Sequence, residues 1–307
     1  MTRHFLRDDD LSPQEQAEVL ALAARMKQEP FGFKPLDGPV SVATIYDKPT
    51  LRTQVSFSAG IAELGGHPMM IDAGLAAAYK RESIADVARV LGRQVGVLVW
   101  RTYAQANLDE MAAHAGIPII NALTDEFHPC QLLADLLTVI ETKGKTQGVS
   151  AAFVGDGACN QGNSWVLAGA TAGMHVRISS PVGHFPDAAV IAKGQQIAQN
   201  TGGSVKILTD PVEAVSGADV VITDTWISMG KEEETDRRLA IFANYAVDEA
   251  LLAHAAPDAV VMHCLPAYRG KEISAAVIDG AQSVVWQEAE NRRHAQKAVM
   301  AWLWERR

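Results

Sequence analysis

The segment from Lys48 to Phe57 places hydroxyl and cationic side chains where a β-rich run gives way to a helical pattern. The first amides of a helix lack intrahelical partners and lie at the positive end of its dipole. Thr50, Arg52 and Thr53 would therefore surround a bound phosphate with hydrogen-bond donors. An ordinary threonine N-cap followed by a surface arginine would give the same pattern. The segment by itself leaves both interpretations open.

Three further segments concentrate polar and reactive side chains: His128-Pro129-Cys130-Gln131, Asp224-Thr225-Trp226-Ile227-Ser228-Met229-Gly230 and His263-Cys264-Leu265-Pro266. Asp224 and His263-Cys264 directly follow apolar runs that read as strands, and so does the turn that ends at Asn160. The carboxyl ends of parallel strands meet at one edge of a sheet, where doubly wound folds bind ligands. We therefore expect Asn160, Asp224 and Cys264 to converge on one crevice.

The run Gly155-Asp156-Gly157-Ala158-Cys159-Asn160 invites a dinucleotide-binding interpretation, which fails at two positions. Asn160 stands where the fingerprint requires its last glycine, and the next predicted strand ends in Ser179-Ser180 without an acidic residue for a ribose. We therefore expect no dinucleotide cofactor.

A zinc site is a second interpretation, because His128, Cys130, His263 and Cys264 are all potential ligands. Neither pair has the spacing of a zinc finger, and Pro129 favours an extended turn beside His128. Cys264 could also act as a nucleophile with His128 or His263 as its base, or be a buried cysteine that behaves as a small apolar residue.

Composition limits the class of protein. The chain has 307 residues, 48% of them hydrophobic, which predicts two domains, and it contains no apolar run long enough for a membrane span. A net charge of −9 argues against nucleic-acid binding. An acidic chain that binds a phosphate must do so through a few localised cations, for which Arg52, Arg101 and Arg292 are the candidates. Three cysteines and a charged N-terminal segment without a signal-peptide pattern fit a reducing cytoplasm.

Strand and helix patterns alternate along the first half of the chain. Ser12-Pro13-Gln14-Glu15 is a capping box with proline at the first helical position, and it predicts a helix to about Lys27. Strands are predicted at 40–46, 68–71, 95–100 and 117–121, with helices at 53–64, 82–91 and 108–115 between them. This succession predicts a parallel sheet covered on both faces.

A long helix is predicted at 129–143, followed by a linker at 143–148 and a second alternating region. Its strands are predicted at 151–154, 175–179, 205–208, 220–223, 260–263 and 284–286. The charge cluster from Lys231 to Arg238 is interpreted as a solvated loop. The fold class is therefore α/β, with two doubly wound parallel-sheet domains linked by long helices. We expect a domain at 1–143, on which a C-terminal helix at 287–307 packs back, and a second domain at 144–286.

Taken together, these segments resemble the aspartate/ornithine carbamoyltransferase family, and most closely its ornithine carbamoyltransferases, over essentially the whole chain. The family's phosphate loop corresponds to Thr50-Leu51-Arg52-Thr53-Gln54. The resemblance implies that carbamoyl phosphate is bound in the first domain and ornithine in the second. The implied carbamoyl phosphate ligands are Thr50, Leu51, Arg52, Thr53, Arg101, His128, Gln131, Cys264, Leu265 and Arg292, and the implied ornithine ligands are Asn160, Asp224, Ser228 and Met229.

The implied reaction transfers a carbamoyl group to the side-chain amine of L-ornithine, giving L-citrulline and phosphate in arginine biosynthesis. Arg101, His128, Asp224 and Cys264 are the implied catalytic residues, and the chemistry needs no metal and no organic cofactor. The family's site is completed across a subunit interface, which implies a homotrimer. The expected partners are the two small-molecule substrates, with no nucleic acid and no membrane.

Departures from the family's pattern fall mainly on the carbamoyl phosphate loop. Leu51 replaces a hydroxyl, Gln54 replaces an arginine, and Ala77 replaces a glutamine that reaches into the neighbouring subunit's site; Lys80 or Arg81 would be needed to compensate. Two alternatives therefore stay open. One is a transferase that moves the acyl group of a different acyl phosphate, or of a larger donor, to ornithine or a related amino acid and releases phosphate. The other is a non-catalytic ornithine-binding protein.

Overall fold

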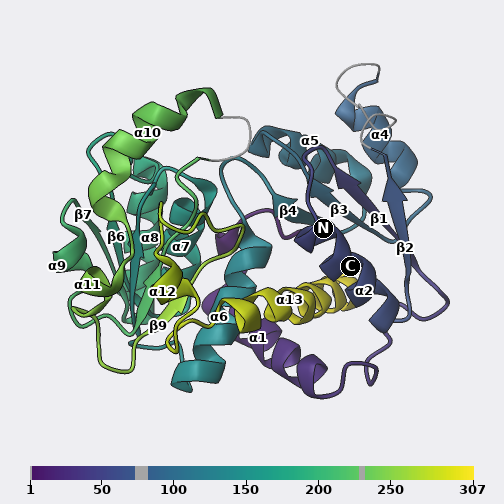
Figure 1. The fold of residues 1–307 in the computed structure, drawn as a ribbon. Helices are drawn as coiled ribbons and strands as arrows, with labels where there is room; N and C mark the ends of the chain where they lie inside the picture. Colours follow the sequence, from purple (N-terminus) through teal and green to yellow (C-terminus); the bar gives the residue numbers. More distant parts are fainter. Residues whose placement is uncertain (1, 73–81, 228–231) are drawn as a thin grey trace. The chain divides into compact units, whose positions relative to one another are not determined.

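The computed structural model describes residues 2–72, 82–227 and 232–307 (Figure 1). The backbone divides into two compact units, of which unit 1 contains Met1–Leu137 and Glu290–Arg307 and unit 2 contains Thr138–Ala289. The divisions fall inside helix α6 (Pro129–Lys143) and inside helix α13 (Val285–Glu305), so two long helices run from one unit into the other. The sequence analysis placed the first of these divisions at the end of α6.

Unit 1 is built on a four-stranded parallel sheet with the order β2-β1-β3-β4. Its strands are β1 (Ser41–Tyr46), β2 (His67–Ile71), β3 (Val97–Arg101) and β4 (Ile119–Leu123). The chain moves from β1 outward to β2 and then returns to the other side of β1 with β3. A doubly wound sheet binds ligands beyond the carboxyl ends of the strands at such a switch point, which here lies between β1 and β3.

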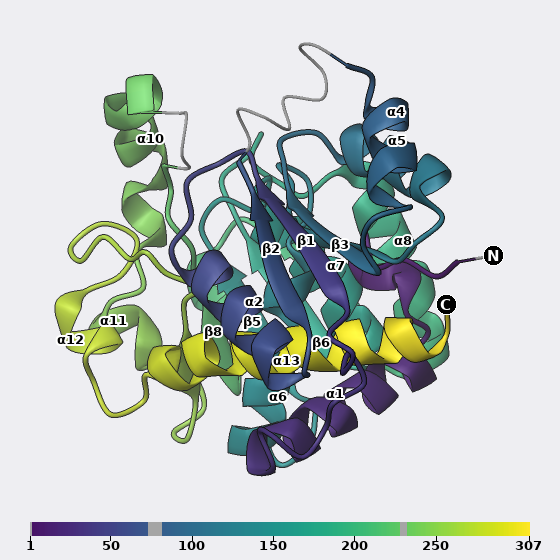
Figure 2. The ribbon, with the colours of Figure 1, turned by 90° about the vertical axis from the view of Figure 1, so that its right-hand side faces the viewer.

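Helices cover both faces of this sheet (Figure 2). Figures 1 and 2 show α4 (Ile84–Leu91) and α5 (Gln105–Ala115) on one side of β1 and β3, and α2 (Arg52–Glu63) and α13 on the other. A core of Ala43, Ile45, Leu98 and Trp100 meets Met111 and its neighbours on the side of α4 and α5. The unit also contains the 3-10 helix η1 (Asp8–Asp10) and the α-helix α1 (Pro13–Gln28).

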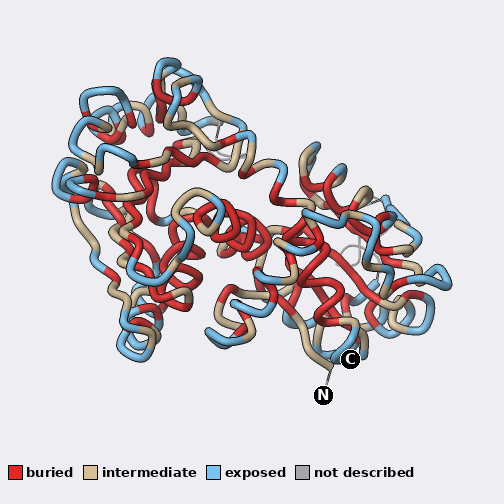
Figure 3. The backbone as a smooth tube through the Cα atoms, turned by 90° about the horizontal axis from the view of Figure 1, so that it is seen from below, coloured by how far each residue is buried: buried red, intermediate tan, exposed pale blue. Residues whose placement is uncertain are grey.

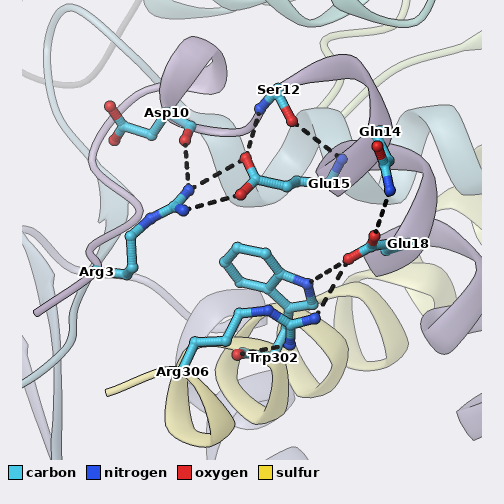
Figure 4. A network of polar contacts seen from close by, with 8 residues as sticks. All are labelled: Arg3, Asp10, Ser12, Gln14, Glu15, Glu18, Trp302 and Arg306. Atoms are coloured by element: carbon cyan, nitrogen blue, oxygen red, sulfur yellow. Dashed lines mark hydrogen bonds and ion pairs between the residues drawn. The ribbon is translucent and has the colours of Figure 1, made fainter.

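The two ends of the chain in unit 1 are tied together by a polar network (Figure 4). The predicted capping box is confirmed, because Ser12 Oγ accepts from Glu15 N and Glu15 Oε2 accepts from Ser12 N. Arg3 pairs with Glu15 at 2.8 Å, while Glu18 accepts from Trp302 Nε1 at 3.2 Å. These contacts fix the start of α1 against the last turns of α13.

Helix α13 also approaches α2 closely, which matters for the site described below. The fully buried Lys297 donates to Glu63 Oε2 at 2.6 Å, and Arg293 pairs with the same carboxylate at 3.3 Å. A Cβ atom at Gly60 would lie 3.0 Å from Lys297 Cγ, so glycine allows the two helices this separation. The position of α13 relative to the start of α2 is therefore fixed by a buried ion pair and a close backbone approach.

Unit 2 is built on a five-stranded parallel sheet with the order β7-β6-β5-β8-β9. Its strands are β5 (Ser150–Val154), β6 (His175–Ser179), β7 (Ser204–Leu208), β8 (Val220–Ile222) and β9 (Val260–Met262). Its helices are α7 (Asn160–Thr171), α8 (Ala188–Thr201), α9 (Pro211–Val215), η2 (Glu232–Glu234), α10 (Thr235–Phe242), η3 (Ala243–Tyr245), α11 (Glu249–Leu252) and α12 (Ala275–Ile278). The strand order reverses between β5 and β8, which places a second switch point there.

The prediction of a strand at 284–286 is wrong, because α13 begins at Val285. Val284 N donates to Val261 O at 3.0 Å, and Ser283 forms an isolated parallel bridge with Val261. A single strand-like pairing thus precedes the helix: Val284 takes part in it, and Val285 is already the first residue of α13. The other predicted strands are present with small differences at their ends.

The inner strands of both sheets are buried, whereas the edge strands β2 and β7 are partly exposed, and other exposed residues follow the loops and outer helix faces (Figure 3). The α/β fold with two parallel sheets is therefore confirmed. Within the described ranges, no helix is both long enough and apolar enough to cross a membrane.

Candidate active site

In unit 1, four elements bring cationic and hydroxyl groups to the carboxyl edge of the sheet. Arg101 is the last residue of β3, Thr53 lies in the first turn of α2, His128 precedes α6, and Arg292 lies on α13. The pairing of β3 with β4 shifts register between Trp100 and Arg101, an irregularity that redirects the strand's last side chain. The sequence therefore places all four groups around the predicted switch point.

The guanidinium of Arg292 is held by hydrogen bonds from two directions. Its Nη1 donates to Gln131 Oε1 at 2.6 Å, and its Nη2 donates to Thr53 Oγ1 at 3.2 Å. Gln131 Nε2 in turn donates to Asp135 Oδ1 at 2.7 Å, and all four side chains are buried. Arg292, Gln131 and Thr53 are thus brought together as expected. Asp135 was missed, although its spacing of four residues from Gln131 on an apolar helix was a readable signal.

His128 is an imidazole kept neutral by its surroundings. Burial, and then the charges of Arg292 and Arg101, hold the pKa of His128 well below its usual value of 6.5. Burial also raises the pKa of the neighbouring Tyr46 hydroxyl to about 12, although both arginines oppose that shift. The charges of both guanidinium groups thus act on His128 and on Tyr46, and His128 contributes hydrogen bonding without a charge.

The loop between β1 and α2 is anchored at its start. Trp100 Nε1 donates to Asp47 Oδ2 at 3.0 Å, and the buried Lys48 forms an ion pair with Asp125. The N-cap of α2 is Leu51, without a side-chain hydrogen bond to the first amides, so the alternative of an ordinary threonine N-cap is wrong. Leu51 is 73% exposed, while Thr50 and Arg52 are partly buried.

In unit 2, Asp224 follows β8 and His263-Cys264 follows β9. Single ligand atoms of Asp224, His263 and Cys264 all lie within 4.8 Å of one another, and Cys264 Sγ donates to Asp224 Oδ1 at 3.3 Å. Burial raises the pKa of Asp224, although His263 and hydrogen bonds from Thr225 and Cys264 oppose the shift. The structure thus brings Asp224 and Cys264 together and makes this carboxylate more basic than an ordinary aspartate.

His263 is engaged at both ring nitrogens. Its Nδ1 accepts from Leu265 N at 2.9 Å, which leaves the proton on Nε2, where Glu272 Oε1 lies at 3.2 Å. The backbone N of His263 donates to Glu288 Oε2 at 2.9 Å. The buried carboxylates of Glu272 and Glu288 were missed, since an acidic residue in a polar loop carries no local signal of burial.

These contacts bear on the zinc interpretation. A nitrogen that accepts a backbone hydrogen bond, or donates to a carboxylate, is not available as a ligand without rearrangement. Cys130, another candidate, is buried and donates to Asn121 O at 3.3 Å, and burial raises the pKa of its thiol to about 12. His263 and Cys130 therefore act as hydrogen-bonding groups, and their donor geometry does not fit a zinc site.

Leu265 has a left-handed backbone, with φ of 60°, next to a cis peptide bond to Pro266. A non-glycine residue in this region costs on the order of 1–3 kcal/mol and is typically found where function requires it. The hydrogen bond from Leu265 N to His263 Nδ1 holds this conformation. The carbonyl groups of Cys264 and Leu265 are thus presented in a fixed orientation beyond β9.

The turn after β5 leads to Asn160, the first residue of α7. Gly157 in this turn and Gly162 in α7 lie too close to neighbouring atoms for a side chain. A Cβ on Gly157 would lie 2.5 Å from Ser180 Oγ, and one on Gly162 would lie 2.1 Å from Gly157 O. Burial raises the pKa of Cys159 well above its usual value, with the charges of Asp224 and Asp156 adding to the shift. Asn160 is therefore carried by a turn close to Asp224.

Ser228 and Met229, predicted to bind ornithine, lie outside the described residues, as do Ala77, Lys80 and Arg81. The interpretation of the cluster ending at Arg238 as a solvated loop needs one correction. Arg238 is buried on α10, forms an ion pair with Asp156 and donates to Trp226 O. A single buried cation among exposed charges was not readable from the sequence because its neighbours have the same composition.

Comparison with known proteins shows which family this chain resembles. A family model described as the carbamoyl-P binding domain of aspartate/ornithine carbamoyltransferase matches residues 3–141, and the Asp/Orn binding domain of the same family matches residues 147–303. A protein of Clavibacter michiganensis subsp. michiganensis named ornithine carbamoyltransferase is 59% identical over 303 residues, 99% of each chain. One of Renibacterium salmoninarum with the same name is 59% identical over 310 residues, covering both chains completely.

Solved structures agree with these matches. The ornithine carbamoyltransferase of Pyrococcus furiosus has a TM-score of 0.94 and 43% identity, covering 98% of this chain and 96% of its own. The anabolic ornithine carbamoyltransferase of Campylobacter jejuni has a TM-score of 0.93 and 34% identity, covering 99% of this chain and 100% of its own. The resemblance stated from the sequence is therefore confirmed.

Proposed function

Because the chain belongs to the aspartate/ornithine carbamoyltransferase family, we propose that it transfers the carbamoyl group of carbamoyl phosphate to L-ornithine, giving L-citrulline and phosphate. The observation that carries the proposal is the buried group of Arg101, His128 and Arg292 around Thr53 at the switch point of unit 1. Two fixed guanidinium groups beside a neutral imidazole and a hydroxyl suit a small phosphorylated substrate.

In this proposal unit 1 binds the donor. Arg52, Arg292 and the first amides of α2 hold the phosphate, with Thr50, Leu51 and Thr53 contributing backbone and hydroxyl groups. Arg101, His128 and Thr53 stabilise the negative charge that develops on the carbamoyl oxygen, and Gln131 fixes Arg292 and contacts the carbamoyl group. The carbonyls at Cys264 and Leu265 receive the carbamoyl NH2.

Unit 2 binds the acceptor, with Asn160, Asp224, Ser228 and Met229 around the α-amino and carboxylate groups of ornithine. The side-chain nitrogen of ornithine attacks the carbamoyl carbon, a C–N bond forms, and the C–O bond to phosphate breaks. The nitrogen must first lose a proton, and Asp224, with its raised pKa and its hydrogen bond from Cys264, is the group suited to accept it. Every step uses groups of this chain and its two substrates.

The altered phosphate loop fits this function if other groups replace the missing donors. Leu51 is exposed and offers only its backbone, and Gln54 offers an amide where relatives of the family have a cation. Since one charge-assisted hydrogen bond contributes about 1.5–3 kcal/mol, Lys80 or Arg81 would have to compensate. The same loop motivates the alternative that ornithine receives its acyl group from a different acyl phosphate, with release of phosphate.

A homotrimer is the assembly we propose. The apolar side chains of Leu51, Val55 and Met70 are 73%, 59% and 64% exposed, on α2 and on β2. β2 is an edge strand, and exposed apolar edges are usually covered by a partner. A second copy that covers them would also bring its own loop to the phosphate site. A reducing cytoplasm is the compartment we propose, since all three cysteines are free thiols.

The test is citrulline formation from ornithine and carbamoyl phosphate by the purified protein, beside a Leu51→Thr, Gln54→Arg, Ala77→Gln triple variant. Turnover by the wild type supports the proposal. Activity in the triple variant alone would mean that the natural donor is another acyl phosphate. Heat-stability shifts with amino acids but not with acyl phosphates, and no turnover in either protein, would favour a non-catalytic ornithine-binding protein.

A further inference from the structure

A pocket of about 350 Å³ with several charged and hydroxyl side chains in its lining lies on one face of β5, β6 and β7 in unit 2. It starts at the amino ends of these strands, whereas the residues assigned to catalysis follow the carboxyl ends of β8 and β9. Ser150, His175 and Ser204, the first residues of the three strands, stand in one row of the sheet. Nothing in the proposed reaction uses this pocket.

The sheet register explains why charged and hydroxyl side chains gather at the pocket. Arg177 pairs with Lys206 in the row above His175, and alternate residues of a strand lie on the same face. On the opposite face, Val176, Ile178 and Val205 are buried. Strands of a parallel sheet are usually apolar on both faces, so this alternation is a departure that the sequence places on two neighbouring strands.

The pocket carries more positive than negative charge. Arg177 donates to Ala214 O and Ser216 O at 2.8 Å each, and also to Ser150 Oγ. These acceptors are neutral, so the guanidinium is held rigidly without its charge being cancelled. Within the described parts of the chain, neither Lys206 nor Glu213 takes part in an ion pair. Two cations and one carboxylate, in a protein of net charge −9, therefore line a volume that suits a small molecule.

We propose that this pocket binds a small metabolite that carries an oxyanion, a phosphate or a carboxylate, against Arg177 and Lys206. The hydroxyls of Ser150 and Ser204 add hydrogen bonds, and Leu208 lines the pocket with an apolar side chain. Glu213, on the first turn of α9, selects against ligands with excess negative charge and favours those that also carry an amine. The site is separate from the substrate groups and is occupied without any chemical step.

The test is methyl NMR on protein labelled at leucine, because the Leu208 side chain lines this pocket. Inorganic phosphate, glutarate and glutamate are titrated separately at constant ionic strength. We expect saturable shifts of the Leu208 signals with at least one of them, and an affinity about tenfold lower in Lys206→Gln, since one charge-assisted contact is lost. Tighter binding of glutamate than of glutarate, lost in Glu213→Gln, would show that the carboxylate recognises an amine.

Lys193→Gln is the matched control, because it removes the same charge from an exposed position on α8. It should leave the affinity unchanged, and both lysine variants should retain citrulline formation. The proposal is overturned if the Leu208 signals do not shift, or if Lys206→Gln and Lys193→Gln bind equally well. Shifts confined to residues near Arg101 would mean that phosphate binds only at the donor site.

Discussion

The carboxyl edges of the two sheets share an architecture and differ in chemistry. In unit 1, the switch point between β1 and β3 gathers Arg101, Arg292 and a neutral His128. In unit 2, the switch point between β5 and β8 gathers Asp224 and Cys264, with His263 held by carboxylates. One edge is organised around fixed cations and the other around a basic carboxylate. The shared sheet topology therefore determines where each site lies, while the residues that follow each strand determine the charge of that site.

The means of support also differ. Arg292 donates to the neutral side-chain oxygens of Gln131 and Thr53, which orient its guanidinium. His263 is held by Glu272 and by the backbone of Leu265, whose left-handed conformation is thereby maintained. The contacts in unit 1 thus orient a cation, whereas those in unit 2 hold the conformation of the backbone after β9.

The largest expected effect comes from removing a cation at the edge of unit 1. Arg101→Ala should lower kcat for citrulline formation by about 10²–10³-fold, since a buried donor aimed at developing charge typically contributes that much. Steady-state kinetics at saturating substrates measure it. Arg93→Ala, which removes an exposed arginine of the same unit, is the control. A kcat within twofold of wild type for Arg101→Ala would break the comparison.

The corresponding change at the edge of unit 2 is Asp224→Asn. We expect kcat to fall by about 10²-fold, because the amide cannot accept the proton of the attacking amine. Carbamoyl phosphate binding, measured by calorimetry, should be unchanged, as it should be in the exposed control Asp109→Asn. A loss of carbamoyl phosphate affinity in Asp224→Asn would show that the two edges do not divide the substrates as proposed.

A smaller effect is expected from restoring donors to the phosphate loop. Leu51→Thr with Gln54→Arg should lower KM for carbamoyl phosphate by about tenfold and leave KM for ornithine unchanged, since one charge-assisted hydrogen bond is gained. Gln14→Arg, which adds the same charge at an exposed position of α1, is the control. An equal decrease in KM for carbamoyl phosphate in the double variant and in Gln14→Arg would mean that the added positive charge, wherever it lies, causes the effect, and not the phosphate loop.

The smallest effect concerns stability and pH. The pKa of His128 is near 6.5 in the unfolded chain and well below it in the folded protein, so the unfolded state binds more protons between those values. The free energy of unfolding should therefore fall as the pH drops below 6.5, by up to about 1.4 kcal/mol per unit from this group.

His128→Gln should make that decline shallower, and urea unfolding at several pH values from 7.5 downward measures it. His67→Gln, which removes an exposed histidine of β2, should keep the wild-type slope. Identical slopes in all three proteins would mean that His128 takes up a proton as readily in the folded state as in the unfolded state, so that its pKa is not lowered by folding.

Much of the fold was readable from the sequence because local patterns and tertiary structure agree. The capping box at Ser12, the long helix α6 and the strand β6 lie where the periodicity predicted them. The prediction of a strand at 284–286 was wrong because the strand-like pairing ends at Val284 and a long helix, set by tertiary packing, begins at Val285. The interpretation of Arg238 as part of a solvated loop was wrong for a related reason. Burial of this one charge depends on its ion pair with Asp156, which is distant in the sequence.

The sequence by itself determined the fold class, the family resemblance and the residues that carry chemistry, because apolar periodicity and short polar motifs are local properties of the chain. Only the tertiary structure decided how those residues are supported: Asp135 behind Gln131, Glu272 behind His263, and Gly60 allowing α13 to reach α2. It also revealed the pocket at Arg177 and Lys206, which requires the register of two strands. Contacts between residues far apart in the chain depend on the packing of whole elements, and no local pattern specifies them.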